Sequence, residues 1–492
     1  MWERFSYYGM RALLVLYMVQ HFRYDDQRAY LTYGSYTALV YATPVVGGML
    51  ADRLLGHKRA VMAGAILMAA GHFAMAFDAG FFPALGLLIV GTGFFKPNIS
   101  TVVGGLYSPG DTRRDSGFTI FYMGINLGAA IAPAICGAIG QTYGWHYGFG
   151  LAGIGMLVGL AVFLCGQEKL SGLGEPHDKA YLTERTKFGL SREVFVYLGA
   201  PVAVVGAWQL MLHGAWVGHV LLALGIVVTV GLVTYLIRLD DIAEKKRLLV
   251  ALILTAFSVV FWAFFEQAGS SLSLFAHRNV DRRLGSGAAE FMYGLFGHHG
   301  NLTPTEIPAS MFQAVNPGFI LLLAPGFSWL WVWLARLGKE PSVAVKFALG
   351  LLQLGLGFGA LWLGAQRAAN DGMVNVGWLV LGYFLHTTGE LCLSPIGLSM
   401  ITKLSPPSIV GLMMGTWFLS SAFAEYAAGL IAALTGVHGE TGTNVAASVP
   451  VPSVTVHIYG HVFGGVALSA ILVGLLLLAI APALAKRIEG VK

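Results

Sequence analysis

Charged residues interrupt the long apolar segments of this sequence at only a few positions. The basic ones lie near the N-terminus and most of the acidic ones lie far beyond them: Glu3, Arg4, Arg11, Lys96, Glu266, Glu390 and Glu425. A charge at the centre of a bilayer costs at least ~2.5–3.5 kcal/mol on insertion scales. If these segments cross a membrane, each charge needs a cavity or a partner, which makes it a candidate functional residue. Glu425 fits a structural pair near the outer surface equally well.

The basic residues near the N-terminus have a helical spacing. Arg4, Tyr8 and Arg11 stand at i, i+4 and i+7, so they share one face of a helix. Two cations and a phenol on one stripe suit a carboxylate ligand. The alternative for Glu3 and Arg4 is that they lie at the membrane interface, with their charged ends among the headgroups.

Lys96 and the membrane glutamates add different chemistry. Lys96 precedes Pro97, which weakens the helix and frees a backbone carbonyl. Burial disfavours the charged form of a carboxyl group, so Glu266 or Glu390 can bind a proton or pair with a cation. A glutamate that takes up a proton releases its cationic partner. Proton-coupled transport requires that kind of switch.

The elements that must position these residues are membrane helices. Hydrophobic residues make up 56% of the 492-residue chain and charged residues 11%, against about 25% charged in a soluble domain. A membrane helix needs about 20 largely apolar residues. The sequence therefore predicts an all-α polytopic membrane protein with fourteen transmembrane helices, at residues 3–22, 32–52, 59–78, 82–106, 116–140, 146–166, 193–212, 215–237, 248–272, 309–335, 343–366, 374–402, 408–435 and 457–485.

Orientation follows from the distribution of lysine and arginine. With the N-terminus in the cytoplasm, most basic residues fall in inward loops, among them the run Lys245–Arg247. This positive-inside bias predicts that both termini are cytoplasmic. The cluster Arg278–Arg283 falls in an outward loop and is an exception to the bias.

A weak internal repeat suggests two halves. The segments 51–59 and 335–339 each follow the second helix of a six-helix set, if residues 193–247 are an insertion. We therefore predict a six-helix bundle at 1–166, a cytoplasmic linker at 167–192, a two-helix insertion at 193–247 and a second six-helix bundle at 248–492. Two bundles repeated in parallel match the major facilitator plan.

Five motifs in the same order strengthen this interpretation. They are Glu3–Gly9, the loop Asp52–Arg59, Gly93–Asn98, Phe121–Gly128 and Gly389–Pro395. With these motifs the chain resembles the proton-coupled oligopeptide transporter family of the major facilitator superfamily over nearly its whole length. The two extra helices resemble the bacterial branch.

The resemblance implies a symporter that imports di- and tripeptides with protons by alternating access across the inner membrane. It implies substrate contacts from the first half at Arg4, Tyr8, Arg11, Tyr41, Lys96 and Asn126, with the cations facing the peptide carboxylate or pairing with membrane glutamates. It implies contacts from the second half at Trp262, Asn316, Glu390, Ser394 and Trp417. Of these, Asn316 and Glu390 would bind the amino group, and Trp262, Ser394 and Trp417 would shape side-chain pockets. The proton-coupling residues would be Glu3 and Glu266.

The family's first signature begins with a further glutamate, three positions before Glu3. That position falls before Met1, so Glu3 is the carboxylate of this signature within the sequence. Either the start of the sequence is trimmed or misassigned, or the protein lacks that carboxylate. If it is absent, Glu3 alone would have to balance Arg4 and Lys96.

Two alternatives remain open. The same fold could carry nitrate, another small anion or a peptide-like drug, and an anion would not need Glu390. An enzyme or a channel is the other class, but the sequence lacks a P-loop and a hydrolase motif.

The pair His298–His299 has no further ligands nearby, so we expect no metal site. We also expect no cofactor other than the coupling protons, no nucleic-acid partner, and a monomer.

Overall fold

A computed structural model describes residues 1–108, 111, 113–170, 172–283, 306–437 and 450–488. The chain divides into two compact units, and the helices α1 (Trp2–Gln20), α2 (Asp26–Leu50) and α10 (Gly214–Arg238) contribute to both of them. Unit 1 comprises Met1–Leu13 and Ser35–Gly218, and unit 2 comprises Leu14–Gly34 and His219–Lys492. We describe each unit by itself.

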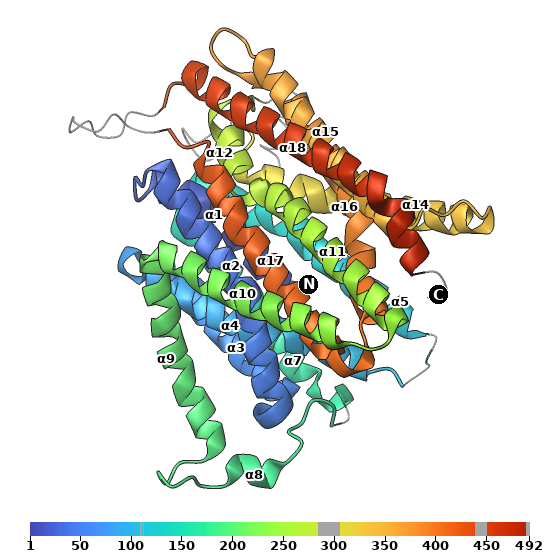
Figure 1. Cartoon of the computed structure of the whole chain (residues 1–492). Helices are drawn as coiled ribbons and strands as arrows, with labels where there is room; N and C mark the ends of the chain where they lie inside the picture. The colour runs from blue at the N-terminus through green and yellow to red at the C-terminus, as the bar shows by residue number, and fades with distance from the viewer. Residues whose placement is uncertain (109–110, 112, 171, 284–305, 438–449, 489–492) are drawn as a thin grey trace. The chain divides into compact units, whose positions relative to one another are not determined.

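Unit 1 is helical. Its helices, including the shared α1 and α2 and the start of α10, are α1 (Trp2–Gln20), α2 (Asp26–Leu50), α3 (His57–Ala74), α4 (Phe81–Gly105), α5 (Arg113–Ala132), α6 (Ala138–Tyr143), α7 (Trp145–Cys165), α8 (Lys179–Thr183), α9 (Arg192–Leu212) and α10 (Gly214–Arg238). Shorter turns lie between them at Ala51–Leu55, Asp78–Gly80, Pro133–Gly137 and Gln167–Leu170. In Figure 1, α3 lies beside α4, and α9 packs on α4.

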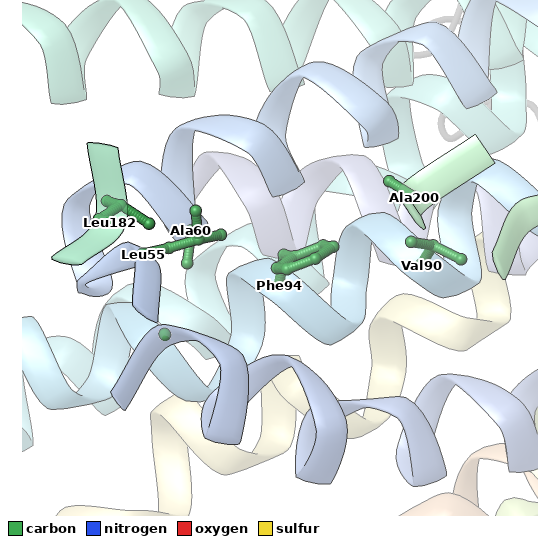
Figure 2. Close-up of a cluster of buried hydrophobic side chains, with 7 residues drawn as sticks. Leu55, Ala60, Val90, Phe94, Leu182 and Ala200 are labelled. Carbon is green, nitrogen blue, oxygen red and sulfur yellow. The ribbon is translucent and has the colours of Figure 1, made fainter. Parts of the chain in front are cut away.

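Small residues let the helices of unit 1 approach closely. A Cβ atom on Gly93 of α4 would stand 2.9 Å from Cβ of Thr43 on α2. The Thr43 hydroxyl donates to the carbonyls of Leu39 and Ile89, each at 3.0 Å. Small side chains at such crossings are typical of membrane helices. A buried apolar cluster continues this packing into α8 and α9; Figure 2 labels its members Leu55, Ala60, Val90, Phe94, Leu182 and Ala200.

Unit 2 contains the second set of long helices and one short sheet. Besides its parts of α1, α2 and α10, its helices are α11 (Ile242–Phe265), α12 (Ser271–Arg278), α14 (Val315–Arg336), α15 (Val343–Gln366), α16 (Val376–Leu404), α17 (Val410–Ala433) and α18 (Pro452–Arg487), with shorter turns at Glu266–Gly269, Ala309–Ala314 and Pro407–Ile409. The strands β1 (Val280–Asp281) and β2 (Val374–Asn375) pair in parallel. Figure 1 shows α15 and α18 side by side, and these two helices pack closely.

A buried ion pair joins the start of α2 to the end of α12 inside unit 2. Arg278 donates to both carboxylate oxygens of Asp26, at 2.6 and 2.8 Å, and both residues are buried. This pair gives a carboxylate partner to one arginine of the cluster Arg278–Arg283. Arg282 likewise pairs with Glu306 at 2.7 Å, and Arg283 pairs with Asp281 at 2.8 Å. Each arginine of the cluster therefore has a carboxylate partner.

Two glycines of unit 2 bring α2 and α17 into backbone contact. A Cβ on Gly34 would lie 2.8 Å from Cα of Gly429, and a Cβ on Gly429 would lie 2.9 Å from Cα of Gly34. No real Cβ atom tolerates that distance, so neither position accepts a side chain without a shift of the helices.

The helical, polytopic character predicted from the sequence is confirmed. Within the described ranges, eleven helices are long and apolar enough to cross a membrane. Helix α1 is not among them because it carries Glu3, Arg4 and Arg11. Each of the fourteen predicted segments falls on helical residues. The segment at 116–140 contains the π-helical stretch Pro133–Gly137 between α5 and α6, and the segment at 248–272 is divided by the turn Glu266–Gly269. The count of fourteen crossings stays a prediction.

Candidate functional site

The first cluster of buried charge lies at the start of α1 in unit 1. Arg4 Nε donates to Glu3 Oε2 at 2.6 Å, and Arg4 Nη2 pairs with Glu3 Oε1. Both residues are less than a tenth exposed. A buried ion pair needs this close contact because each charge has lost its hydration. This burial argues against the alternative in which Glu3 and Arg4 lie at the membrane interface with their charged ends among the headgroups.

Aromatic rings complete the surroundings of the cations. The Arg4 guanidinium lies 5.9 Å from the ring centroid of Tyr8, and that of Arg11 lies 5.7 Å from the same ring. The three side chains therefore share one face of α1, as their spacing predicts. Lys96 Nζ stands 3.6 Å from the ring centroid of Tyr41. The face of an aromatic ring attracts a cation, and more strongly when both are desolvated.

A cavity of about 290 Å³ opens beside this cluster. Glu3, Arg4 and Lys96 line it together with Phe121 and Ile125 of α5. The two α5 side chains were not predicted as site residues, although they lie inside the motif Phe121–Gly128. Tyr8, Arg11, Tyr41 and Asn126 are not part of its lining. The Asn126 amide is buried and donates to the carbonyl of Tyr122 in its own helix, at 3.0 Å.

The second cluster lies in unit 2, where α14 meets α16. The Asn316 amide donates to Glu390 Oε2 and to Thr387 Oγ1, at 2.9 Å each. Thr387 and Glu390 are three residues apart on α16, so both side chains point to the same neighbour. The structure thus brings the predicted residues Asn316 and Glu390 together. Thr387 was missed, and its i, i+3 spacing from Glu390 is the signal that could have identified it.

Glu266 lies where the helical course of the chain is broken. It opens the 3-10 turn Glu266–Gly269 between α11 and α12, is 6% exposed, and interacts electrostatically with Glu390. The neighbouring Gln267 fixes this turn. Its amide donates to the carbonyl of Ala428 at 3.0 Å, and its oxygen accepts from the Ser271 hydroxyl at 2.7 Å. Gln267 is a second residue that the sequence did not single out.

The predicted side-chain pocket residues are partly buried and lie on α11, α16 and α17. Trp262 packs at right angles to Phe261 and near-perpendicular to Phe265, with ring centroids 5.3 and 5.2 Å apart. A Cβ on Gly397 would lie 2.6 Å from the ring of Trp417, so the missing side chain makes room for the indole. Glu390, Ser394 and Gly397 are spaced i, i+4 and i+7 and share one face of α16.

The expected absence of a metal site stays an expectation. Within the described residues, no group of three or more His, Cys, Asp or Glu side chains could hold a metal ion. The pair His298–His299 lies outside the described residues.

Long apolar helices that carry buried charged side chains in both units are typical of a polytopic membrane transporter, and the chain has the major facilitator fold of the solved transporter that it matches. The chain belongs to the POT family, whose sequence model matches residues 58–448. This result confirms the resemblance drawn from the five motifs.

Individual relatives agree with this assignment. The peptide transporter YePEPT of Yersinia enterocolitica is 39% identical over 463 residues, which cover 88% of this chain and 85% of that protein. The di-/tripeptide transporter of Lactococcus lactis is 36% identical over 445 residues, covering 86% and 85%. A crystal structure of the peptide transporter POT in complex with sulfate superposes with a TM-score of 0.78 at 35% identity, covering 99% of this chain and 94% of that one.

Proposed function

We propose that this chain is a proton-coupled symporter that imports di- and tripeptides by alternating access. The observation that carries the proposal is the opposite net charge of the two clusters. In unit 1 the cations Arg4, Arg11 and Lys96 outnumber Glu3, and in unit 2 the carboxylates are Glu266 and Glu390. A free peptide is a zwitterion, and charges of opposite sign suit its two ends. The names of the Yersinia and Lactococcus relatives supply the substrate class.

The roles of the first-half residues follow from their chemistry. Arg4, Arg11 and Lys96 would bind the peptide carboxylate, since cations without hydration bind carboxylates strongly. Tyr8, Tyr41 and Asn126 would complete the walls around them. Arg4 already has a carboxylate partner in Glu3, so substrate would compete with that ion pair.

The roles of the second-half residues follow in the same way. Glu390 and Asn316 would bind the peptide amino group. Trp262, Ser394 and Trp417 would shape the space for side chains, so that affinity comes mainly from the two peptide termini.

Protonation would act through Glu3 and Glu266. A proton on Glu266 removes the repulsion between its carboxylate and that of Glu390, and a proton on Glu3 releases Arg4. Each event changes the charge next to a substrate-binding residue, which is the requirement for coupling.

The proposal includes the arrangement of the chain. Fourteen helices would cross the inner membrane with both termini in the cytoplasm, and the transporter would act as a monomer. The division into bundles at 1–166 and 248–492, a linker at 167–192 and an insertion at 193–247 belongs to the same proposal.

Uptake of a labelled dipeptide into proteoliposomes tests the function. With an inward proton gradient we expect accumulation, and the same vesicles without a gradient provide the control. Vesicles that fail to accumulate any member of a small dipeptide panel would exclude peptide symport.

Nitrate is the alternative cargo, and Glu390→Gln discriminates between the two. Loss of a charge-assisted hydrogen bond costs ~1.5–3 kcal/mol, or about ten- to a hundredfold in peptide affinity. Nitrate has no amino group, so its transport would survive the substitution. Nitrate flux is measured in the wild type and in Glu390→Gln. If both transport nitrate equally and the variant takes up no peptide, nitrate is favoured as the cargo.

A further inference from the structure

A second cavity of unit 1 is apolar and has no place in the proposed transport cycle. It has a volume of about 640 Å³ and is enclosed mainly by α2, α4 and α9. Its apolar lining includes Val46, Leu50, Val90, Phe94, Val196 and Ala203. Val90, Phe94 and Ala200, which Figure 2 labels, belong both to this lining and to the buried cluster of unit 1.

The surroundings of this cavity restrict what can fill it. All three enclosing helices are long and apolar enough to cross a membrane. An apolar cavity does not hold water, because water needs two or more polar partners. An empty cavity would forfeit the dispersion contacts of its walls. Lipid acyl chains are the apolar medium around helices that cross a membrane, and a volume in the ~300–1,000 Å³ range is that of an ordinary ligand pocket.

One charged side chain lines the cavity, where α9 begins. Arg192 Nη1 donates to the carbonyl of Tyr181 at 2.8 Å and pairs with Glu184, and the guanidinium lies 3.7 Å from the Tyr181 ring centroid. These bonds use Nη1, so the N–H groups of Nε and Nη2 remain for a further acceptor. The hydroxyl of Thr186, also in the lining, donates to the Leu190 carbonyl at 2.9 Å.

We infer that this cavity binds one acyl chain of an anionic phospholipid, with the lipid phosphate held by Arg192. A guanidinium suits phosphate because its planar N–H groups match two phosphate oxygens. The acyl chain would lie along α9 past Val196 and Ala203, against Val90 and Phe94. The lipid would thereby fasten α9 to α2 and α4.

Glycines in α9 provide a matched pair of variants. A Cβ on Gly199, which lines the cavity, meets nothing within 4 Å, so Gly199→Leu would fill the cavity without a backbone clash. Gly206 lies on the same helix, also meets nothing within 4 Å, and is outside the lining. Gly206→Leu therefore adds the same side chain without touching the cavity.

Photo-crosslinking of the full chain in liposomes tests the inference. The probe is phosphatidylglycerol with a diazirine in its acyl chain, and peptide mapping finds the labelled segments. We expect labelling of α9 around residues 196–203 in the wild type and in Gly206→Leu, and its loss in Gly199→Leu. Equal labelling of all three proteins would overturn the acyl-chain site. If Gly199→Leu does not fold, Ala203→Phe fills the same cavity and the same comparison applies.

Headgroup selectivity tests the role of Arg192. One arginine near an anionic lipid contributes ~1 kcal/mol, so phosphatidylglycerol should label about fivefold more than phosphatidylethanolamine with the same diazirine chain. Arg192→Gln should abolish this preference, and Lys187→Gln, an exposed neighbour outside the lining, should retain it. Both lipids carry a phosphate and differ in net charge, so equal labelling by the two in the wild type would overturn the preference for an anionic lipid.

Discussion

Two buried glutamates, Glu3 in unit 1 and Glu390 in unit 2, have different partners. In unit 1, Glu3 pairs with the permanently charged guanidinium of Arg4. In unit 2, Glu390 accepts a hydrogen bond from the neutral amide of Asn316. A proton on Glu3 breaks an ion pair, whereas a proton on Glu390 leaves its neighbour uncharged. A buried acid that is held by an amide can therefore change its charge at less cost to its surroundings.

Removing the cation from unit 1 should have the largest effect. Arg4→Gln would leave Glu3 buried without its guanidinium, which costs ~3–5 kcal/mol in the free energy of unfolding. Equilibrium unfolding in mixed detergent micelles measures this. The double variant Glu3→Gln/Arg4→Gln should recover most of the loss, and the exposed Arg238→Gln should be neutral. A double variant as unstable as Arg4→Gln would contradict the role of the ion pair.

Removing the amide from unit 2 should cost less. Asn316→Ala deletes one hydrogen bond to a carboxyl group, worth ~1.5–3 kcal/mol, and Glu390 can offset part of this by taking up a proton. The same unfolding assay gives the value, with Asn370→Ala, at an exposed turn, as the surface control. A loss equal to that of Arg4→Gln would remove the difference between the two units.

Glu266 should affect coupling more than stability. We expect Glu266→Gln to keep peptide exchange and to lose proton-driven accumulation, because a glutamine cannot carry a proton. One pH unit corresponds to 1.36 kcal/mol per proton, so the lost accumulation is about tenfold per unit of gradient. Counterflow and gradient-driven uptake in the same vesicles separate the two activities. Accumulation at the wild-type level would show that Glu266 is not the essential proton carrier.

Carboxylates outside the membrane should have the smallest effect between pH 5 and 8. The hydrogen bond from Lys58 lowers the pKa of Glu175 below its ordinary value of 4.5, and hydrogen bonds from Arg283 lower the pKa of Asp281 from 3.8 to about 2. Because both are depressed, their contribution to stability is complete above the ordinary values and is lost only as pH falls below them.

The pH profile of dipeptide uptake checks this prediction. Glu175→Gln and Asp281→Asn should leave the shape of the profile between pH 5 and 8 unchanged. A profile that flattens in either variant would assign the titration to the surface, not to the membrane carboxylates.

Local features could be predicted from the sequence because they depend on neighbours along the chain. The long apolar runs predict the helices, and the spacing of Arg4, Tyr8 and Arg11 predicts their common face. The break at Glu266–Gly269 was not predicted, because no proline marks it and the short polar stretch that it opens lies between long apolar flanks.

Contacts between distant residues needed the structure. Asn316 and Glu390 are 74 positions apart, and Asp26 and Arg278 are 252 apart, so no periodicity links them. The family resemblance suggested the first pair, whereas the exceptional arginine cluster gave only a sign that partners were required. Thr387 and Gln267 were missed because neutral polar residues are common in membrane helices. They lack the large insertion free energy that makes a charged residue a candidate functional residue.

The bare contact between Gly34 and Gly429 has a consequence for kinetics. Where side chains interdigitate, two helices can separate only after several rotamers have changed, and this raises the activation barrier. Two backbone surfaces have no rotamers to change, so they can part and meet again along a smooth path. An alanine at either position would therefore alter the rate of helix separation as well as the resting distance.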